Sequence, residues 1–336
     1  MDQSEFERVH REAIVIDGTC PLLNDESYVP WWVEGGATAA APTVGGSDRA
    51  AATLKNLARW RRIIDRDDRL ILVRSAADIE AAKVEGRFGI IFHFQGTAPV
   101  EDDLDLVDAF KGLGVGMIQL AYNVRNAVGD GAEERTNAGL SHFGIRLIER
   151  LNEARVIVDC SHTGERTTLD AIERSTAPVV FSHANARALK PSARTITDQQ
   201  IRAAAETGGL VGIVGFPAFV SDSPRPTLDE FIAHIDYVVN LAGIDHVGLG
   251  IDYYQGQAGV ADLETAEAMY RSAVASGRWN PESYPPPPYY YPAGIETPRT
   301  LPNLTRRLLE RGYSEEDAKK VLGGNWLRVF QEVWGN

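Results

Sequence analysis

Short apolar runs separated by helical patterns are the feature that most constrains the fold of this chain. The runs are five to eight residues long, mostly β-branched, aliphatic or aromatic, and lie at 13–17, 88–94, 115–122, 156–162, 178–183, 210–216 and 246–252. Their polarity does not alternate cleanly from residue to residue, which is typical of strands buried on both faces. We therefore expect parallel β-strands covered on both sides.

Helical patterns rich in Ala, Leu, Arg and Glu fill most of the gaps between the runs, at 76–86, 103–114, 144–154, 166–175 and 198–209. Such repeated alternation predicts βαβ units and a parallel sheet. With the run at 35–46 as a further strand, the count reaches the eight of a (β/α)8 TIM-type barrel. The alternative is an open doubly wound sheet, but no GxGxxG pattern follows the first strand to support dinucleotide binding.

Residues 253–300 interrupt this alternation with a Pro- and Tyr-rich segment, in which prolines 285–288 precede three tyrosines. Such a composition indicates extended chain rather than helix or strand. We expect one barrel domain over 1–336, with 253–300 inserted either as a surface loop or as a lid, around 277–299, over the barrel mouth. The tail is predicted to form two helices, the second capped by Ser314.

The overall charge narrows the range of partners. The 336 residues carry a formal net charge of −13, which argues against nucleic acid or an anionic membrane as the main partner. Two cysteines, Cys20 and Cys160, cannot build a disulfide framework. The polar N-terminus has no signal-peptide pattern, and no window approaches the ~18 apolar residues of a membrane span. We expect a cytoplasmic protein.

Three histidines and an aspartate stand where predicted strands end: His93, His162, His183 and Asp252. The carboxyl ends of barrel strands meet at one mouth, where active sites of this architecture lie. Imidazole and carboxylate groups that converge there make a divalent metal site with an open position. Zinc suits such ligands best, and Mn, Fe or Co also fit. The alternative is that each histidine merely completes a hydrogen-bonded strand end.

Three stretches of the chain resemble a known family. VDCSHTGERTTLDAIERSTAPVVFSHANARALKPSARTITDQQI, the later HVGLGIDYYQG and the tail LPNLTRRLLERGYSEEDAKKVLGGNWLRVF are similar to the membrane (renal) dipeptidase family of metallopeptidases. The similarity extends over nearly the whole chain. It implies a (β/α)8 barrel of the metal-dependent hydrolase kind, with C-terminal helices.

The resemblance also implies roles for individual residues. His162 and His183 match the family's metal-binding histidines, and Arg194 matches the arginine that holds the substrate carboxylate. Asp252 matches the general acid/base that serves the scissile amide.

Three positions depart from the family pattern. Thr19-Cys20-Pro21 replaces a His-x-Asp metal pair, Gln95 replaces a glutamate that bridges two metals, and Asn123 replaces a substrate-facing histidine. We therefore expect one metal rather than two, held by His162 and His183. The third ligand is open among Asp252, His93, Gln95 and Cys20. For Cys20 the alternative is an ordinary small core residue.

These assignments predict a metal-dependent hydrolase of the C–N bond in a small amide that carries a carboxylate. The metal would activate water, Asp252 would transfer its proton, and Arg194 would bind the carboxylate. Asn123 and Gln95 are candidate hydrogen-bond donors to a substrate oxygen. The alternatives are a metal-free protein that binds a small acid, and a lyase on the same barrel. The family resemblance further favours a homodimer.

Overall fold

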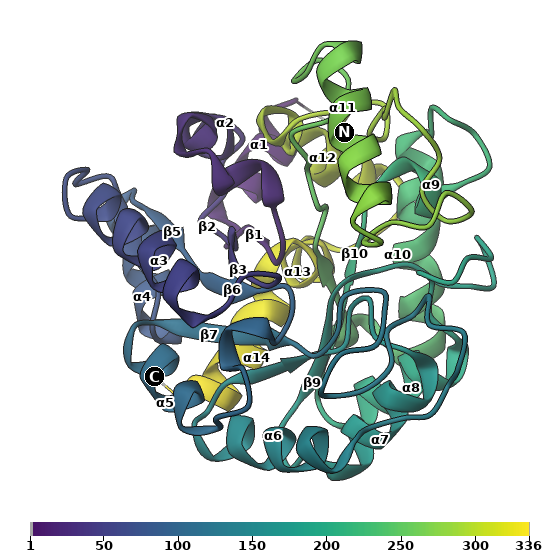
Figure 1. The fold of residues 1–336 in the computed structure, drawn as a ribbon. Helices are drawn as coiled ribbons and strands as arrows, with labels where there is room; N and C mark the ends of the chain where they lie inside the picture. The colour runs from purple at the N-terminus through teal and green to yellow at the C-terminus, as the bar shows by residue number, and fades with distance from the viewer. Residues whose placement is uncertain (1–2, 336) are drawn as a thin grey trace.

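The computed structural model describes residues 3–335 of the chain, and its centre is a curled parallel sheet (Figure 1). The strands are β1 (Ile16–Asp17), β2 (Ala39–Ala40), β3 (Thr43–Gly45), β4 (Leu70–Leu72), β5 (Phe88–Ile90), β6 (Phe92–Phe94), β7 (Val115–Gln119), β8 (Ile157–Asp159), β9 (Val179–Ala184), β10 (Val211–Ile213) and β11 (Val247–Leu249). Their order is β3-β6-β7-β8-β9-β10-β11-β1-β2-β5-β4, with parallel pairing throughout.

The sheet closes into a ring because two stretches of the chain each contribute two consecutive short strands, one near each end of the strand order. β2 and β3 both belong to 39–45, and β5 and β6 both belong to 88–94. β2 pairs with β5, and β3 pairs with β6, so these two segments run side by side over their whole length. The eight predicted strand segments therefore curl into one barrel, and the predicted fold is confirmed.

β4 was absent from the sequence-based prediction. It pairs with β5 alone, outside the ring of eight segments. Only Leu70 of its three residues is buried. So short a half-exposed run carries little hydrophobic pattern from which to recognise a strand.

Helices surround the strands (Figure 1). The five predicted between the runs are observed as α4 (Ala76–Glu85), α5 (Asp105–Gly112), α6 (His142–Glu153), α7 (Glu165–Arg174) and α8 (Asp198–Glu206). The others are α1 (Gln3–Glu12), α2 (Val29–Glu34), α3 (Ala50–Ile64), α9 (Pro217–Val220), α10 (Leu228–Ala242), α11 (Leu263–Ala275), α12 (Pro302–Glu310), α13 (Glu315–Lys319) and α14 (Asn325–Trp334). Ser314 caps α13 by accepting from the Asp317 amide, as the sequence predicted.

The last helix packs its aromatic side chains against residues of the strands. Trp326 and Phe330 of α14 pack in one buried cluster with strand residues such as Ile16 and Met117. The Trp326 indole donates to the Leu249 carbonyl at 2.9 Å, and a Cβ at Gly18 would lie 2.4 Å from this ring. Glycine at that position therefore lets the helix come close to the strands.

The Pro- and Tyr-rich segment packs firmly on the rest of the protein. Apart from α11 and a short turn of helix at Pro298–Thr300, residues 253–300 are irregular, yet Tyr284, Tyr289 and Tyr291 are buried. Whether the segment opens as a lid, and whether 1–336 behaves as a single domain, stay predictions. Within residues 3–335, no helix is long and apolar enough to cross a membrane.

Candidate metal centre and active site

The predicted site residues follow strands that end at the same mouth of the barrel. Three of them, Asn123, His162 and Asp252, have left-handed backbones with φ of 61°, 59° and 63°. Within residues 3–335, only two other non-glycine residues have positive φ. Such conformations cost free energy, and they concentrate at functional sites where the surroundings hold them in place.

Two histidines from adjacent strands face each other at this mouth. His162 follows β8 and His183 lies in β9, and their Nε2 atoms are 2.7 Å apart. Both rings are buried. Burial lowers the pKa of both imidazoles well below the usual value, so both rings are neutral at pH 7.

The hydrogen on His162 is fixed by Asn123. The Asn123 amide nitrogen donates to the Arg278 carbonyl at 2.7 Å, which accepts only. Its oxygen therefore faces His162 Nδ1, at 2.7 Å, and Nδ1 must carry the hydrogen. The lone pair of His162 is consequently on Nε2.

The hydrogen on His183 is fixed in the same way by Ser182 and Asp159. Burial raises the pKa of the Asp159 carboxyl, but the hydrogen bond and charge of His93, with the hydrogen bond from Ser182, outweigh burial and lower this pKa to about 2, so Asp159 is an ionised acceptor. Ser182 Oγ donates to Asp159 Oδ2 at 2.6 Å and must accept from His183 Nδ1 at 2.8 Å. The lone pair of His183 is therefore on Nε2 as well.

Two acceptor lone pairs thus point at each other across 2.7 Å. Neutral imidazoles in this arrangement repel unless an electrophile lies between or beside them. A divalent metal ion supplies that positive charge, and neutral imidazole nitrogens oriented by outer hydrogen bonds are its usual ligands. The pair therefore fits one metal ion.

The other proposed ligands differ in how near they lie. The Gln95 amide is 3.5 Å from His183 Nε2, and an exchange of its oxygen and nitrogen would present an oxygen ligand. His93 instead turns to Asp159, with Nε2 at 3.1 Å from Oδ2. Cys20 is fully buried, and burial raises its thiol pKa well above the usual value, which disfavours a thiolate. Within residues 3–335, no three His, Cys, Asp or Glu side chains form a group able to hold a metal.

The residues that replace the family's first metal ligands leave a second ion little to bind. Thr19 donates its hydroxyl hydrogen to the Gly18 carbonyl, and its own carbonyl accepts from the Asp252 amide. Pro21 has no ligand side chain, and Gln95 has no charge to balance two cations. The donor set suits one ion and does not suit a pair.

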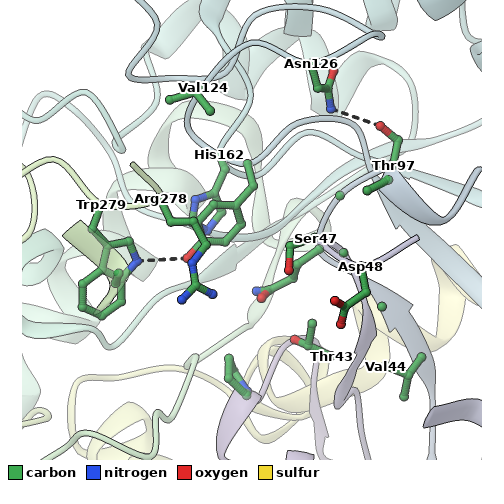
Figure 2. Close-up of a pocket in the computed structure, with 18 of the residues that line it drawn as sticks. Thr43, Val44, Ser47, Asp48, Thr97, Val124, Asn126, His162, Arg278 and Trp279 are labelled. Carbon is green, nitrogen blue, oxygen red and sulfur yellow. Dashed lines mark hydrogen bonds between the residues drawn. The ribbon is translucent and has the colours of Figure 1, made fainter. Parts of the chain in front are cut away.

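Asp252 lines a pocket of about 860 Å³ together with His162 and Gln95. Burial raises the pKa of its carboxyl well above the usual value, and the charge of Arg194 opposes this only in part. A raised pKa favours the protonated form of a carboxyl, which is the change in acidity that a general acid/base requires. In Figure 2, His162, Arg278 and Trp279 lie on one side of this pocket and Thr43, Ser47 and Asp48 on the other.

Arg194 lies on the far side of His162 from this pocket. Both residues line a second cavity of about 400 Å³. Arg194 is buried, its guanidinium lies 5.2 Å from the Phe219 ring centroid, and Nε donates to the Tyr284 hydroxyl at 2.9 Å. This bond uses Nε and leaves the terminal amino groups for a carboxylate.

Sequence reasoning did not single out several residues that shape the site. Ser182 and Asp159 orient His183, and the Tyr122 ring stacks on His162 with centroids 4.0 Å apart. Tyr122 and Asp159 can be recognised in the sequence as residues at the ends of apolar runs. Tyr284 and Trp279 belong to the Pro- and Tyr-rich segment, and no local pattern shows that they reach the site.

Comparison with known proteins assigns the family. The sequence profile of membrane dipeptidases, peptidase family M19, matches residues 28–272 and 289–335, which is most of the chain. The chain belongs to the membrane dipeptidase family. This family consists of metallopeptidases, so the predicted membership and the predicted class of metal-dependent amide hydrolase are confirmed.

Individual relatives agree with this assignment. A crystal structure described as an amidohydrolase from Pseudomonas aeruginosa is 33% identical, covers 98% of this chain and 99% of its own, and has a TM-score of 0.87. An uncharacterized protein of the pqqA 5′ region in Klebsiella pneumoniae is 32% identical over 79% of this chain and 90% of its own length. Dipeptidase tcpJ of Claviceps purpurea is 28% identical over 79% of this chain and 56% of its own length.

Proposed function

We propose that this membrane dipeptidase family member hydrolyses the C–N bond of a small amide that carries a carboxylate, with one divalent metal ion. Zinc is the ion we expect, because two neutral imidazole nitrogens suit it. The observation that carries the proposal is the pair of Nε2 lone pairs that face each other at 2.7 Å. The Gln95 amide oxygen is the proposed third protein ligand.

The bound metal would supply a water whose pKa is low enough to yield hydroxide near pH 7. The chain's own groups do the rest. The Asp252 carboxylate takes the proton of the attacking water and returns it to the leaving nitrogen, so the C–N bond breaks as the amine becomes neutral. The terminal amino groups of Arg194 hold the substrate carboxylate from the second cavity.

Metal analysis tests this proposal directly. We expect one metal ion per chain in the purified protein, and none in the His162→Ala/His183→Ala double variant. A panel of dipeptides and N-acylated amino acids should yield the free amine and acid with the wild type only. Two ions per chain would contradict the single-metal site.

Two further outcomes would point to other functions. A protein that takes up no metal, even after reconstitution with zinc or manganese, would be a small-acid binding protein rather than a hydrolase. Products that lack the atoms of added water would indicate a lyase.

A further inference from the structure

One wall of the pocket comes from a part of the chain that the family profile does not match. The unmatched residues are 273–288, between the two matched segments. They include Trp279 and Tyr284, and both line the pocket of His162 and Asp252. This part of the pocket wall therefore lies outside the segments that the family profile matches.

The Tyr284 hydroxyl lies between two residues of the site and receives a hydrogen bond from each. Arg194 Nε donates to it at 2.9 Å, and Asn123 Nδ2 donates to it at 3.1 Å. A phenol oxygen that accepts two such bonds still has its own hydrogen to donate. The nearest acceptor for that hydrogen is Asn123 Oδ1 at 3.5 Å, an oxygen that already accepts from His162.

Asn123 has no hydrogen left for a substrate. Its amide nitrogen donates to the Arg278 carbonyl and to Tyr284, and its oxygen serves His162. The predicted role of Asn123 as a donor to substrate is thus unsupported by its contacts. The Tyr284 hydroxyl, in contrast, donates only the long 3.5 Å bond to Asn123 Oδ1, so its hydrogen can turn to a substrate oxygen.

The Tyr284 ring is held rigidly in place. Trp279 stacks on it with centroids 4.6 Å apart and an interplanar angle of 5°, and Phe219 meets it edge-on at 5.2 Å. The Trp279 indole in turn donates to the Tyr122 hydroxyl at 3.1 Å. Burial raises the pKa of the Tyr284 phenol well above its usual value, so it keeps its hydrogen at neutral pH. A fixed donor of this kind needs little reorganisation during a reaction.

We propose that Tyr284 donates a hydrogen bond to the carbonyl oxygen of the scissile amide as that oxygen becomes negatively charged. This inference rests on the proposed amide hydrolysis. Water oxygen bonds to the carbonyl carbon, and the π electron pair moves onto the carbonyl oxygen, where the Tyr284 hydroxyl stabilises it. The pair returns as the C–N bond breaks, and Tyr284 keeps its proton throughout. Tyr284 is thereby a catalytic residue that the unmatched segment brings to the site.

The test compares Tyr284→Phe with Tyr289→Phe, using the panel substrate that the wild type hydrolyses best. Tyr289 is the matched control because it lies in the same Pro- and Tyr-rich segment and is also buried. Its hydroxyl donates to the Pro285 carbonyl, and Tyr289 does not line the pocket. We expect Y284F to lower kcat by roughly 10²- to 10³-fold with little change in KM, the usual effect of losing one oxyanion donor. Y289F should retain wild-type kcat.

Two additional measurements separate this role from a structural one. A phosphinate analogue of L-Ala-D-Ala, whose anionic oxygens imitate the tetrahedral intermediate, should bind Y284F at least ~10-fold more weakly than wild type, measured by calorimetry. Tyr284→His, which restores a ring with a donor, should recover part of the lost kcat.

The results distinguish failure of the inference from failure of the proposed function. An active wild type whose Y284F variant keeps kcat within a few-fold would overturn the inference alone. A wild type with neither bound metal nor amide hydrolysis would overturn both.

Discussion

His183 keeps a lone pair on Nε2 because Ser182 and Asp159 stand behind it, and Asn123 does the same for His162. The orientation of the two histidines that would bind the metal thus depends on side chains that would not touch it. Such outer partners set the tautomer and the ring orientation of a histidine ligand, and their loss typically costs roughly 10- to 100-fold in metal affinity or activity.

Removal of the Ser182 hydroxyl should therefore weaken metal binding. We expect Ser182→Ala to lower the affinity for zinc by about 10-fold or more, because His183 Nδ1 loses its acceptor. Competition against a chromogenic chelator measures this. Ser175→Ala is the control, since that hydroxyl bonds to Asn152 and Ala177 near the end of α7. Equal affinity in S182A and wild type would refute the orienting role.

The buried carboxyl of Asp17 should make the stability of the protein depend on pH. Burial raises the pKa of its carboxyl to about 7, although it accepts from the Ile251 amide at 2.9 Å and from the Trp32 indole. Because the pKa of Asp17 is higher in the folded than in the unfolded state, Asp17 contributes its full stabilisation below about pH 4. This contribution to the free energy of unfolding is lost as pH rises toward 7. This loss amounts to at most roughly 4 kcal/mol.

The variant Asp17→Asn should remove this contribution to the pH dependence. We expect the free energy of unfolding of wild type to fall more between pH 4 and pH 8 than that of D17N. Urea unfolding at the two pH values measures both differences. The exposed Asp68, replaced by Asn, should leave the wild-type pH dependence unchanged. Parallel pH profiles for wild type and D17N would show that Asp17 is ionised in the folded protein.

Among the elements, the unmatched segment 273–288 combines irregular backbone with buried rings. Trp279 packs against Tyr284, Tyr289 and Phe216 and donates to Tyr122. Beyond the end of α11 at Ala275, this segment has no helix or strand and few backbone hydrogen bonds of its own, so side-chain contacts hold it in place.

Loss of the Trp279 ring should therefore loosen the segment locally. We expect Trp279→Ala to be cleaved within 273–288 several-fold faster than wild type by a nonspecific protease, and to show a lower kcat because Tyr284 loses its stacking partner. Mass spectrometry of timed digests locates the cut. Tyr290→Ala is the control, because this ring packs on Arg225 and does not line the pocket. Unchanged cleavage would mean that other contacts hold the segment.

At the scale of the whole molecule, the residues that stabilise the barrel and the residues of the candidate site lie in different regions. Trp326, Phe330 and Trp334 of α14 pack against residues of the strands, and Trp334 donates to the Gly116 carbonyl at the start of β7. The histidine pair and Asp252 lie at the strand ends across the barrel. Stability and chemistry are thus carried by different residues, as is usual for this architecture.

Replacing Trp326 should therefore lower stability without altering the site. We expect Trp326→Ala to reduce the free energy of unfolding by about 3 to 5 kcal/mol, because it empties a fully buried position. Its metal content in the folded state should equal that of wild type. Urea unfolding and metal analysis measure the two quantities. Val84→Ala, at a position 87% exposed, should change stability little. Metal loss in folded W326A would show that the two regions are coupled.

The sequence by itself determined the barrel and much of its mouth. Buried strands must be nearly continuous apolar runs, so all eight strand segments were visible, and β4 escaped because it is short and half exposed. Parallel strands also bring their carboxyl ends together, and this rule alone assigns His162, His183 and Asp252 to one region of the molecule.

Only the tertiary structure decided which groups touch. His93 and His183 both follow the rule for strand ends, yet His93 turns to Asp159 while His183 meets His162. Tyr284 lies 161 positions from Asn123 in the chain and still contacts it. The hydrophobic pattern reports which face of an element is buried, but it carries no information on rotamers, tautomers or the path of an irregular segment. Those follow from packing and from hydrogen bonds between residues that are distant in sequence.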